Sequence, residues 1–360
     1  MSTQKFRIGI IGAGGIAQAV HIPGWKKLPD VEIVAVCDLH GPTAQKAAAA
    51  AGGAQAFTDP AELLALGLDA VDVCTPNKAH TPSVILALEA GCHVLCEKPL
   101  ATSTDEIRAM GAAATKAGRV LCTVQDHRYR AETQAIKTWA NAGHLGAVYH
   151  ARVRAMRRAW LPGRAGFIDA ELAGGGPCMD IGVHALDAAM WVMDFPKPVR
   201  VTGVSRVNFA HGHKIPGKWG DWDRSRFSVE DFAAGFVHFE NGATMILEAA
   251  WLGHQKEDED FSFQLFGTEG GVHWPSGEIA SVSSGVFVDG QLSSPGGGEQ
   301  RHDGQIAAFY RACVAGEPSP VPWTESIQVI AILEAIYASQ RTGREIEFTQ
   351  PVATASPDVS

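Results

Sequence analysis

Residues 6–17 read FRIGIIGAGGIA, an apolar run that leads directly into Gly12, Gly14 and Gly15. In a G-x-G-x-x-A pattern the first glycine permits a tight turn and the second lets backbone approach a ligand. The small residue at the last position, Ala17, lets a helix pack close to the strand. The stretch therefore predicts a strand, a tight turn and a helix whose N-terminus can receive a pyrophosphate.

The first third of the chain repeats this alternation of apolar runs and helices. Each run is continuously apolar, which is typical of parallel strands covered on both faces. Helix-start signals separate the runs, among them Asp59-Pro60 and the capping box of Ser103 with Glu106. The pattern predicts a doubly wound parallel sheet, a Rossmann domain that we place at residues 1–126. The further runs lie at 32–38, 69–75, 92–97 and 119–124.

Beyond residue 126 the pattern changes. A long strand from about residue 147 is followed by a helix at 177–193. Two more strands are joined by Asn241-Gly242, a strong signal for a hairpin. We expect residues 127–360 to form an α+β domain with a largely antiparallel open sheet, and helices near 130–142, 304–315 and 325–341.

Composition narrows the classes of function. The chain of 360 residues has a net charge of −9 and no cluster of Lys and Arg interleaved with aromatics, which argues against nucleic-acid binding. We expect no membrane segment and no signal peptide, hence a cytoplasmic location. The seven cysteines mostly lie in apolar runs, as in a reducing compartment. We also expect no metal site. The alternation of side chains along a strand places His93 on the opposite face from Cys92 and Cys96, and the His211/His213 pair has no nearby thiolate.

The second apolar run ends in Asp38, where an acidic residue hydrogen-bonds the ribose diol of a dinucleotide and repels a 2′-phosphate. Leu39 and His40 follow it, with no adjacent Arg or Lys to hold such a phosphate. NAD is therefore favoured over NADP. Its pyrophosphate should rest on the turn formed by residues 12–16 (Gly12, Gly14, Gly15 and Ile16).

The fourth apolar run ends in Glu97-Lys98-Pro99. Side chains at the carboxyl ends of parallel strands face the ligand crevice. A lysine there can stabilise the alkoxide that forms as a hydride leaves a substrate alcohol. The alternative for a lone lysine is a solvated side chain before a loop.

The helix expected at 177–193 carries an apolar stripe beside a polar one. Asp180, His184 and Asp187 share a face at spacings of four and three residues. A carboxylate one turn from a histidine can orient its ring and raise its basicity, as a general base requires. The alternative is a core histidine satisfied by its helix neighbours.

The GAGGIA turn, the EKP strand end and the GGGxxxDxGxH helix, in this order, resemble the glucose–fructose oxidoreductase/inositol dehydrogenase/MocA family over residues 5–348. The resemblance implies an NAD-dependent dehydrogenase acting on a secondary ring hydroxyl of a sugar or cyclic polyol, assembled as a dimer or tetramer. It implies that Lys98 and His184 are the catalytic pair and that Asp180 orients substrate and histidine, while we interpret Asp187 as structural. Cofactor-lining roles are implied for Thr75, Pro76, Asn77, His80 and Glu97.

Substrate contacts are the least defined part of this prediction. The candidates are His127, Arg128, Trp160 and Arg164. The tryptophans of the glycine-rich loop at 211–227 either stack on a sugar or anchor the loop. Two other functions stay open: an NAD-assisted glycosidase or lyase that oxidises the sugar transiently, and a non-catalytic NAD-binding sensor.

Overall fold

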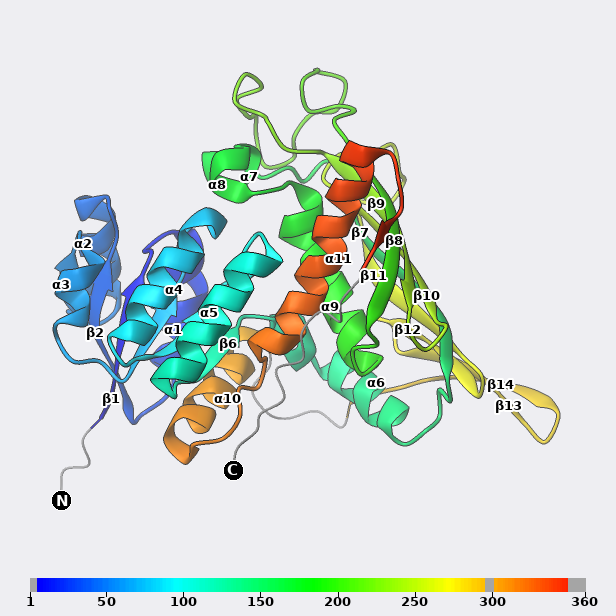
Figure 1. The fold of residues 1–360 in the computed structure, drawn as a ribbon, viewed down its shortest axis with the longest axis horizontal. Coiled ribbons are helices and arrows are strands. Elements are labelled where there is room, and N and C mark those ends of the chain that lie inside the picture. The colour runs from blue at the N-terminus through cyan, green and yellow to red at the C-terminus, as the bar shows by residue number, and fades with distance from the viewer. Residues whose placement is uncertain (1–4, 295–300, 349–360) are drawn as a thin grey trace. The chain divides into compact units, whose positions relative to one another are not determined.

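The computed structural model describes residues 5–294 and 301–348, which divide into two compact units (Figure 1). The N-terminal unit contains the described residues up to Tyr129 and residues 301–326, and the C-terminal unit contains residues 130–294 and 327–348. This differs from a simple division at residue 126. The returning segment packs into the N-terminal core through Ile306, Phe309 and Val321, and the Thr123 N–H donates to the Val321 carbonyl (3.1 Å). Periodicity alone did not reveal that return.

The sheet of the N-terminal unit has six parallel strands in the order β3-β2-β1-β4-β5-β6. The order reverses between β1 and β4, so the glycine turn after β1 lies at the switch point where such sheets bind ligands. The predicted Rossmann fold is confirmed. The strands are β1 (Phe6–Ile11), β2 (Val31–Cys37), β3 (Gln55–Phe57), β4 (Ala70–Val73), β5 (His93–Cys96) and β6 (Leu121–Thr123).

The helices of this unit begin where the sequence signals indicated. Asp59 caps α3 by accepting from the Ala61 N–H (2.8 Å), and Ser103 caps α5 by accepting from the Glu106 N–H (3.3 Å). Its helices are η1 (Ala17–His21, a π-helix), α1 (Ile22–Trp25), α2 (Gly41–Ala50), α3 (Pro60–Leu64), η2 (Asn77–Ala79), α4 (His80–Glu89), α5 (Thr104–Ala117), η3 (Asp126–Tyr129) and α10 (Arg301–Ala315).

The C-terminal unit is built on a nine-stranded sheet in the order β14-β13-β12-β11-β7-β10-β9-β8-β15. All neighbours are antiparallel except β7 and β10, so the expected largely antiparallel sheet is confirmed. Gly242, at φ +85°, forms the predicted turn between β9 and β10. The strands are β7 (Val148–Arg157), β8 (Pro198–Arg206), β9 (Phe232–Phe239), β10 (Thr244–Ala250), β11 (Glu259–Gly267), β12 (Gly270–Trp274), β13 (Glu278–Ser283), β14 (Val286–Gln291) and β15 (Ile346–Glu347).

Helices cover one face of this sheet (Figure 1). Gly203 and Gly235 lie against Ile336, where an added Cβ would come within 2.8 and 2.6 Å of α11 atoms, so the missing side chains allow close packing. The helices are α6 (Ala131–Asn141), α7 (Ala165–Ile168), α8 (Ala170–Ala173), η4 (Cys178–Gly182, a π-helix), α9 (Val183–Val192) and α11 (Trp323–Thr342). Over the described ranges, the structure contains no helix whose length and apolarity would suit a bilayer crossing.

Candidate active site

The glycine turn after β1 is shaped for close approach of a ligand. Gly12 has φ +92°, and a Cβ there would lie 2.5 Å from the backbone of Cys74, so only glycine fits. A Cβ on Gly14 would meet nothing within 4 Å. Gly14, Gly15 and Ile16 are exposed, whereas Ala17, the first residue of η1, is fully buried, as the motif predicted.

Asp38 follows β2 and is hydrogen-bonded to the glycine turn. Its Oδ2 accepts from the Ala13 N–H (2.9 Å) and its Oδ1 from the His40 N–H (2.9 Å). Each carboxylate oxygen keeps a second lone pair with which to accept from a ribose hydroxyl. The next side chain, Leu39, is apolar and 90% exposed. A 2′-phosphate beside Asp38 would therefore meet a carboxylate and a leucine rather than an adjacent Arg or Lys.

Thr75, Pro76 and Asn77 follow β4 beside this turn. The buried Thr75 Oγ1 has no hydrogen-bond partner within the described part of the chain. His80 is fully buried instead of lining an open surface, and its ring nitrogens lie 2.8 Å from the Pro99 carbonyl and 2.9 Å from the Thr75 carbonyl. His80 thus joins the segment after β4 to the segment that carries Lys98.

Glu97, Lys98 and Pro99 follow β5, at the carboxyl edge of the sheet as predicted. Glu97 is 7% exposed, and its Oε2 accepts from the Lys98 backbone N–H (3.0 Å). The Lys98–Pro99 peptide is cis. The lysine is partly exposed.

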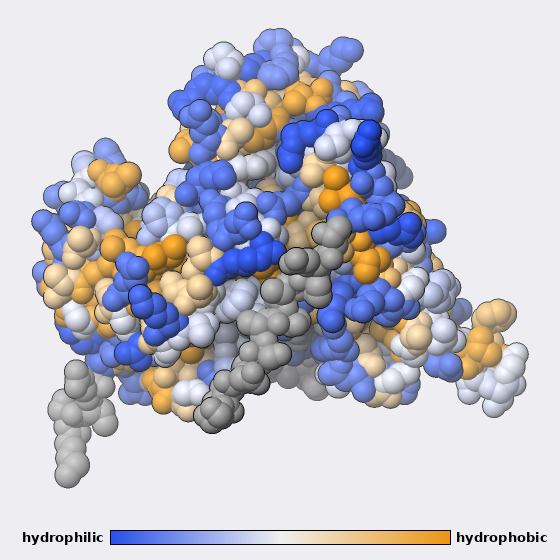
Figure 2. Space-filling model, viewed as in Figure 1, coloured by the Kyte–Doolittle hydropathy of each residue, from blue (hydrophilic) through white to orange (hydrophobic). Residues whose placement is uncertain are grey.

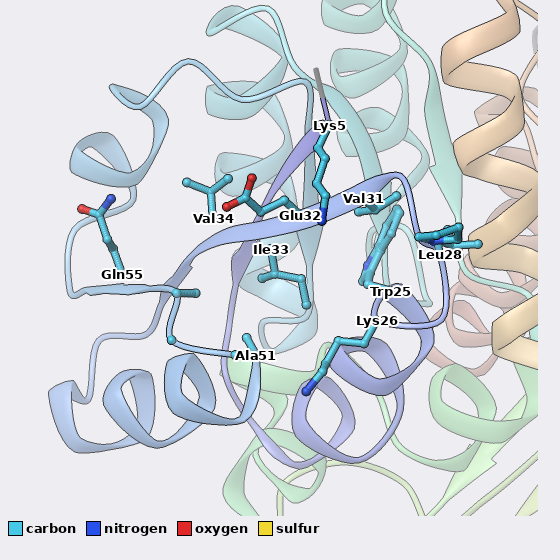
Figure 3. A pocket seen from close by; sticks show the side chains of 14 residues that line it. Lys5, Trp25, Lys26, Leu28, Val31, Glu32, Ile33, Val34, Ala51 and Gln55 are labelled. Carbon is cyan, nitrogen blue, oxygen red and sulfur yellow. The ribbon is translucent and has the colours of Figure 1, made fainter. Parts of the chain in front are cut away.

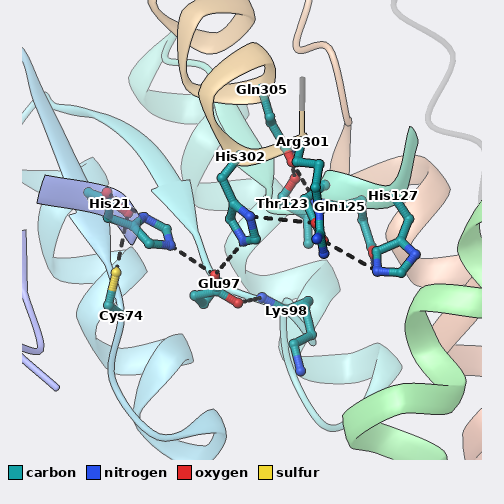
Figure 4. Close-up of polar contacts among 12 residues, drawn as sticks. His21, Cys74, Glu97, Lys98, Thr123, Gln125, His127, Arg301, His302 and Gln305 are labelled. Atoms are coloured by element: carbon teal, nitrogen blue, oxygen red, sulfur yellow. Dashed lines mark hydrogen bonds and ion pairs between the residues drawn. The ribbon is translucent and has the colours of Figure 1, made fainter. Parts of the chain in front are cut away.

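A buried polar network that the sequence analysis missed surrounds Glu97 (Figure 4). His21, on η1, lies between Asp72 (Nδ1 to Oδ2, 2.7 Å) and Glu97 (Nε2 to Oε1, 2.9 Å). Burial opposes the charge on His21, but Asp72 outweighs it and raises the His21 pKa well above 6.5. Burial likewise opposes the charge on Glu97, but the hydrogen bond and charge of His21 lower its pKa to about 2.

Residues of α10 complete this network. His302 Nε2 lies 3.9 Å from Glu97 Oε1, and its Nδ1 lies 3.5 Å from Asp126 Oδ2. Arg301 donates from Nε to the same Asp126 oxygen (3.1 Å). The sequence offered only two signals for this network. One is His21, a histidine in an otherwise apolar helix start, and the other is the Arg301-His302 pair, which is distant from every recognised motif.

In the C-terminal unit, Glu230 fixes the start of the segment that carries Asp180 and His184. Its carboxylate accepts from the backbone N–H groups of Gly176 (2.8 Å) and Cys178 (3.1 Å) and from the Tyr337 hydroxyl (2.8 Å). Gly176 leaves no room for a side chain, since a Cβ would lie 2.0 Å from the Glu230 carbonyl oxygen. Sequence reasoning missed Glu230 as well, because it reaches this helix from the start of another strand.

The predicted helix at 177–193 is present as η4 followed by α9, but its surroundings differ from expectation. We expected an apolar stripe beside a polar stripe. Instead, most residues of α9 are buried, Asp187 (1% exposed) included, because both the sheet and α6 pack against this helix. Asp180 accepts from Trp251 Nε1 (3.1 Å), and His184 is partly exposed. Orientation of His184 by Asp180 stays a prediction.

The two substrate candidates on η3 have different surroundings. Arg128 is 2% exposed and forms an ion pair with Glu325, so its guanidinium serves the packing of the N-terminal unit in this structure. His127 is partly exposed, with Nε2 3.9 Å from Asp126 Oδ1. Of the two candidates, His127 has the side chain that a substrate can reach, so the predicted contact is assigned to His127.

The aromatic candidates lie in the C-terminal unit. Trp160 packs against Trp219 with ring centroids 5.2 Å apart, and Trp219 is 55% exposed. Trp222 is buried and donates from Nε1 to the Ala210 carbonyl (2.8 Å). The 211–227 loop thus uses Trp222 as an anchor and presents Trp219 at its surface. Arg164 is exposed at the start of α7.

A separate hollow of about 440 Å³ lies at the amino ends of β1 and β2, lined by Lys5, Trp25, Lys26, Glu32 and other residues (Figure 3). The glycine turn and Lys98 follow the carboxyl ends of their strands. The hollow is therefore at the opposite edge of the sheet and does not belong to the candidate site.

Comparison with known proteins identifies the family. Residues 6–125 match the model of an oxidoreductase family with an NAD-binding Rossmann fold, and residues 133–273 match the GFO/IDH/MocA C-terminal domain. A relative from Escherichia coli (strain K12), D-glucoside 3-dehydrogenase, is 36% identical over 96% of this chain and 99% of its own length. The chain belongs to the GFO/IDH/MocA family of oxidoreductases.

Other family members extend the comparison. Myo-inositol 2-dehydrogenase of Thermotoga maritima is 29% identical over 74% of both chains. The crystal structure of GenD2 from gentamicin A biosynthesis, in complex with NAD, superposes with a TM-score of 0.79 at 26% identity, over 97% of this chain and 98% of that one. The predicted family, its oxidoreductase activity and its NAD cofactor are confirmed.

The residues at the N-terminal site fit NAD. The open backbone at Gly14 would receive the pyrophosphate, Asp38 would accept from the adenosine ribose, and the buried Thr75 hydroxyl would supply an additional polar group beside the turn. Bound there, NAD supplies the acceptor for a hydride.

Proposed function

We propose that this family member oxidises a secondary ring hydroxyl of a sugar, sugar derivative or cyclic polyol, with a D-glucoside oxidised at carbon 3 as the favoured substrate. The observation that carries this proposal is the whole-length similarity to D-glucoside 3-dehydrogenase together with the position of Lys98 after β5. The similarity to myo-inositol 2-dehydrogenase supports the broader class of cyclic polyols.

In this proposal the residues divide the chemistry between them. Lys98 donates a hydrogen bond to the substrate oxygen and stabilises the negative charge that develops there. His184 accepts the hydroxyl proton as general base, and Asp180, itself held by Trp251, supports the histidine. Glu230 acts at a distance, because it fixes the backbone from which that segment begins.

NAD is proposed to be preferred over NADP. Asp38 supports this preference because its carboxylate would repel a 2′-phosphate, and the exposed Leu39 offers that phosphate no counter-charge. We also propose a cytoplasmic location, which the seven unpaired cysteines support.

A homodimer or homotetramer is proposed on the basis of the sheet face opposite the helices. Phe236 and Ile246 pair across β9 and β10 on this face and are 37% and 36% exposed. The β13–β14 hairpin adds exposed Val286 and Phe287. Figure 2 shows hydrophobic surface where this hairpin projects. Exposed apolar side chains that lie together on a surface are typical of an interface. Light scattering should report an oligomer, and Phe236→Lys should shift it toward monomer.

The experiment that tests the function is a panel of glucosides, free sugars and inositols, incubated with NAD while absorbance of reduced nicotinamide is followed. We expect a pyranoside with a free hydroxyl at carbon 3 to give the fastest reduction, and its 3-deoxy analogue to give none. Cleavage of a glycoside without net reduced nicotinamide would instead indicate the NAD-assisted glycosidase. Binding of NAD without turnover of any panel member would indicate the sensor.

A further inference from the structure

His21 is remote in sequence from the predicted catalytic residues, yet it is hydrogen-bonded to the segment that carries Lys98. It is fully buried, and each ring nitrogen lies within hydrogen-bond distance of one carboxylate oxygen. Carboxylates accept and do not donate when ionised. Both ring nitrogens must therefore carry protons, which makes His21 an imidazolium.

The surrounding donors support ionised carboxylates on both sides of this ring. Trp25 Nε1 donates to the same Asp72 oxygen that faces His21 (2.7 Å), and the Cys74 thiol lies 3.6 Å from the other Asp72 oxygen. On the far side, Glu97 accepts from the Lys98 N–H through its second oxygen (3.0 Å).

The remaining neighbour is His302, whose ring meets that of His21 edge-on with centroids 5.8 Å apart. Burial lowers the His302 pKa. Asp126 and Glu97 oppose this shift, whereas the positive charges of His21 and Arg301 add to it, so the His302 pKa lies below 6.5. His302 is therefore the neutral member of the pair, so a charge on His21 does not require two adjacent cations.

We propose that His21 is a positioning residue of the oxidation site: as an imidazolium between Asp72 and Glu97, it fixes the strand end that presents Lys98. The connection is direct, because one Glu97 oxygen accepts from His21 and the other accepts from the Lys98 backbone. Removing the imidazolium would leave two buried carboxylates without their shared cation, and Glu97 would turn away from the Lys98 N–H. Only the kinetic consequence of this inference rests on the proposed function; the charge on His21 does not.

The first test uses the wild-type protein labelled with ¹⁵N-histidine. His21→Gln and Asp72→Asn each identify the His21 ring signals by their loss or shift. We expect both ring nitrogens to be protonated at pH 7.5, above the ordinary imidazole pKa of 6.5. A neutral ring, or a signal that responds to added Zn²⁺ or to EDTA, would overturn the proposal, the latter in favour of a metal held by His21, Glu97 and His302, whose ligand atoms lie within 4.8 Å of one another.

The second test compares the kinetics of His21→Gln with a matched control, His93→Gln, at the amino end of the same β5 strand that leads to Lys98. A small displacement of a catalytic group costs about 100-fold in rate. We expect His21→Gln to lower kcat roughly 10- to 100-fold while NAD affinity stays within about 3-fold, and His93→Gln to leave both nearly unchanged.

The two proposals fail in different ways. Loss of NAD affinity in parallel with kcat, or wild-type kcat in a folded His21→Gln variant, would contradict the positioning role while leaving the dehydrogenase intact. A wild-type protein that oxidises no panel member refutes the proposed function, and the ring-nitrogen measurement still decides the state of His21. Should His21→Gln not fold, Asp72→Asn replaces it, with the same expected loss of kcat.

Discussion

The buried ion pair between Glu97 and His21 predicts how stability depends on acidic pH. Glu97 has a pKa of about 2 in the folded protein, against an ordinary value of 4.5. Since the folded pKa is the lower one, the stabilisation is present above pH 4.5 and is lost as the pH falls toward 2. The contribution of His21 depends on pH in the opposite direction. Because its pKa is raised in the folded protein, its stabilisation is present below pH 6.5 and is lost as the pH rises through the pKa of the folded state.

The magnitude follows from these pKa values. Between pH 6 and pH 3 the unfolded carboxyl takes up a proton that the folded one does not, which removes about 2 kcal/mol of the free energy of unfolding. Glu97→Gln removes the titrating group, so the variant should be less stable at pH 6 but should lose about 2 kcal/mol less than wild type on acidification.

The assay is urea unfolding followed by tryptophan fluorescence at half-unit intervals between pH 3 and pH 6. Glu32→Gln is the matched control, because Glu32 is an exposed carboxylate on β2 of the same unit. We expect the control to retain the wild-type pH dependence. Parallel wild-type and Glu97→Gln curves would refute the reasoning, since Glu97 would then titrate alike in folded and unfolded chains.

Three further predictions concern the site itself. Lys98→Ala should lower kcat by roughly 100-fold or more with NAD affinity, measured by fluorescence titration, nearly intact; retention of most activity would remove Lys98 from the mechanism. Asp38→Ala should weaken NAD binding roughly 10-fold and lower the ratio of kcat/KM with NAD to kcat/KM with NADP, because the ribose acceptor and the repulsion of the 2′-phosphate are lost together. An unchanged ratio would mean that Asp38 does not contact the ribose. His184→Asn should lower the oxidation rate roughly 100-fold and remove the acidic limb of the pH profile, because a histidine base must be neutral; an unshifted limb at wild-type rate would return His184 to a packing role.

Local patterns predicted those parts of the site that a few consecutive residues define. Gly12 has the positive φ and Gly14 the open space that the motif requires. Asp38 reaches the glycine turn, and Lys98 follows a parallel strand at its carboxyl end. In each case the chemistry depends on a strand end, and strand ends are visible in sequence as the point where an apolar run stops.

Other parts of the site depend on contacts between segments that are distant in sequence, and the periodicity of apolar residues gives no information about such contacts. His21 meets Asp72 and Glu97 across 51 and 76 positions, and Arg128 meets Glu325 across 197. The helix around His184 looked amphipathic because its neighbours could not be known, although sheet and helix bury nearly all of it. Likewise Trp219 and Trp222 are equivalent by composition, and only the path of the loop makes one exposed and the other an anchor.

The most direct test of the central claim is the fate of the hydrogen on the oxidised carbon. A D-glucoside deuterated at carbon 3 is incubated with the protein and NAD, and the reduced cofactor is examined by mass spectrometry. We predict that deuterium appears in the reduced nicotinamide in proportion to the 3-keto product, and that Lys98→Ala abolishes both. Ketone formation without deuterium in the cofactor, or release of the label to water, would contradict hydride transfer from that carbon.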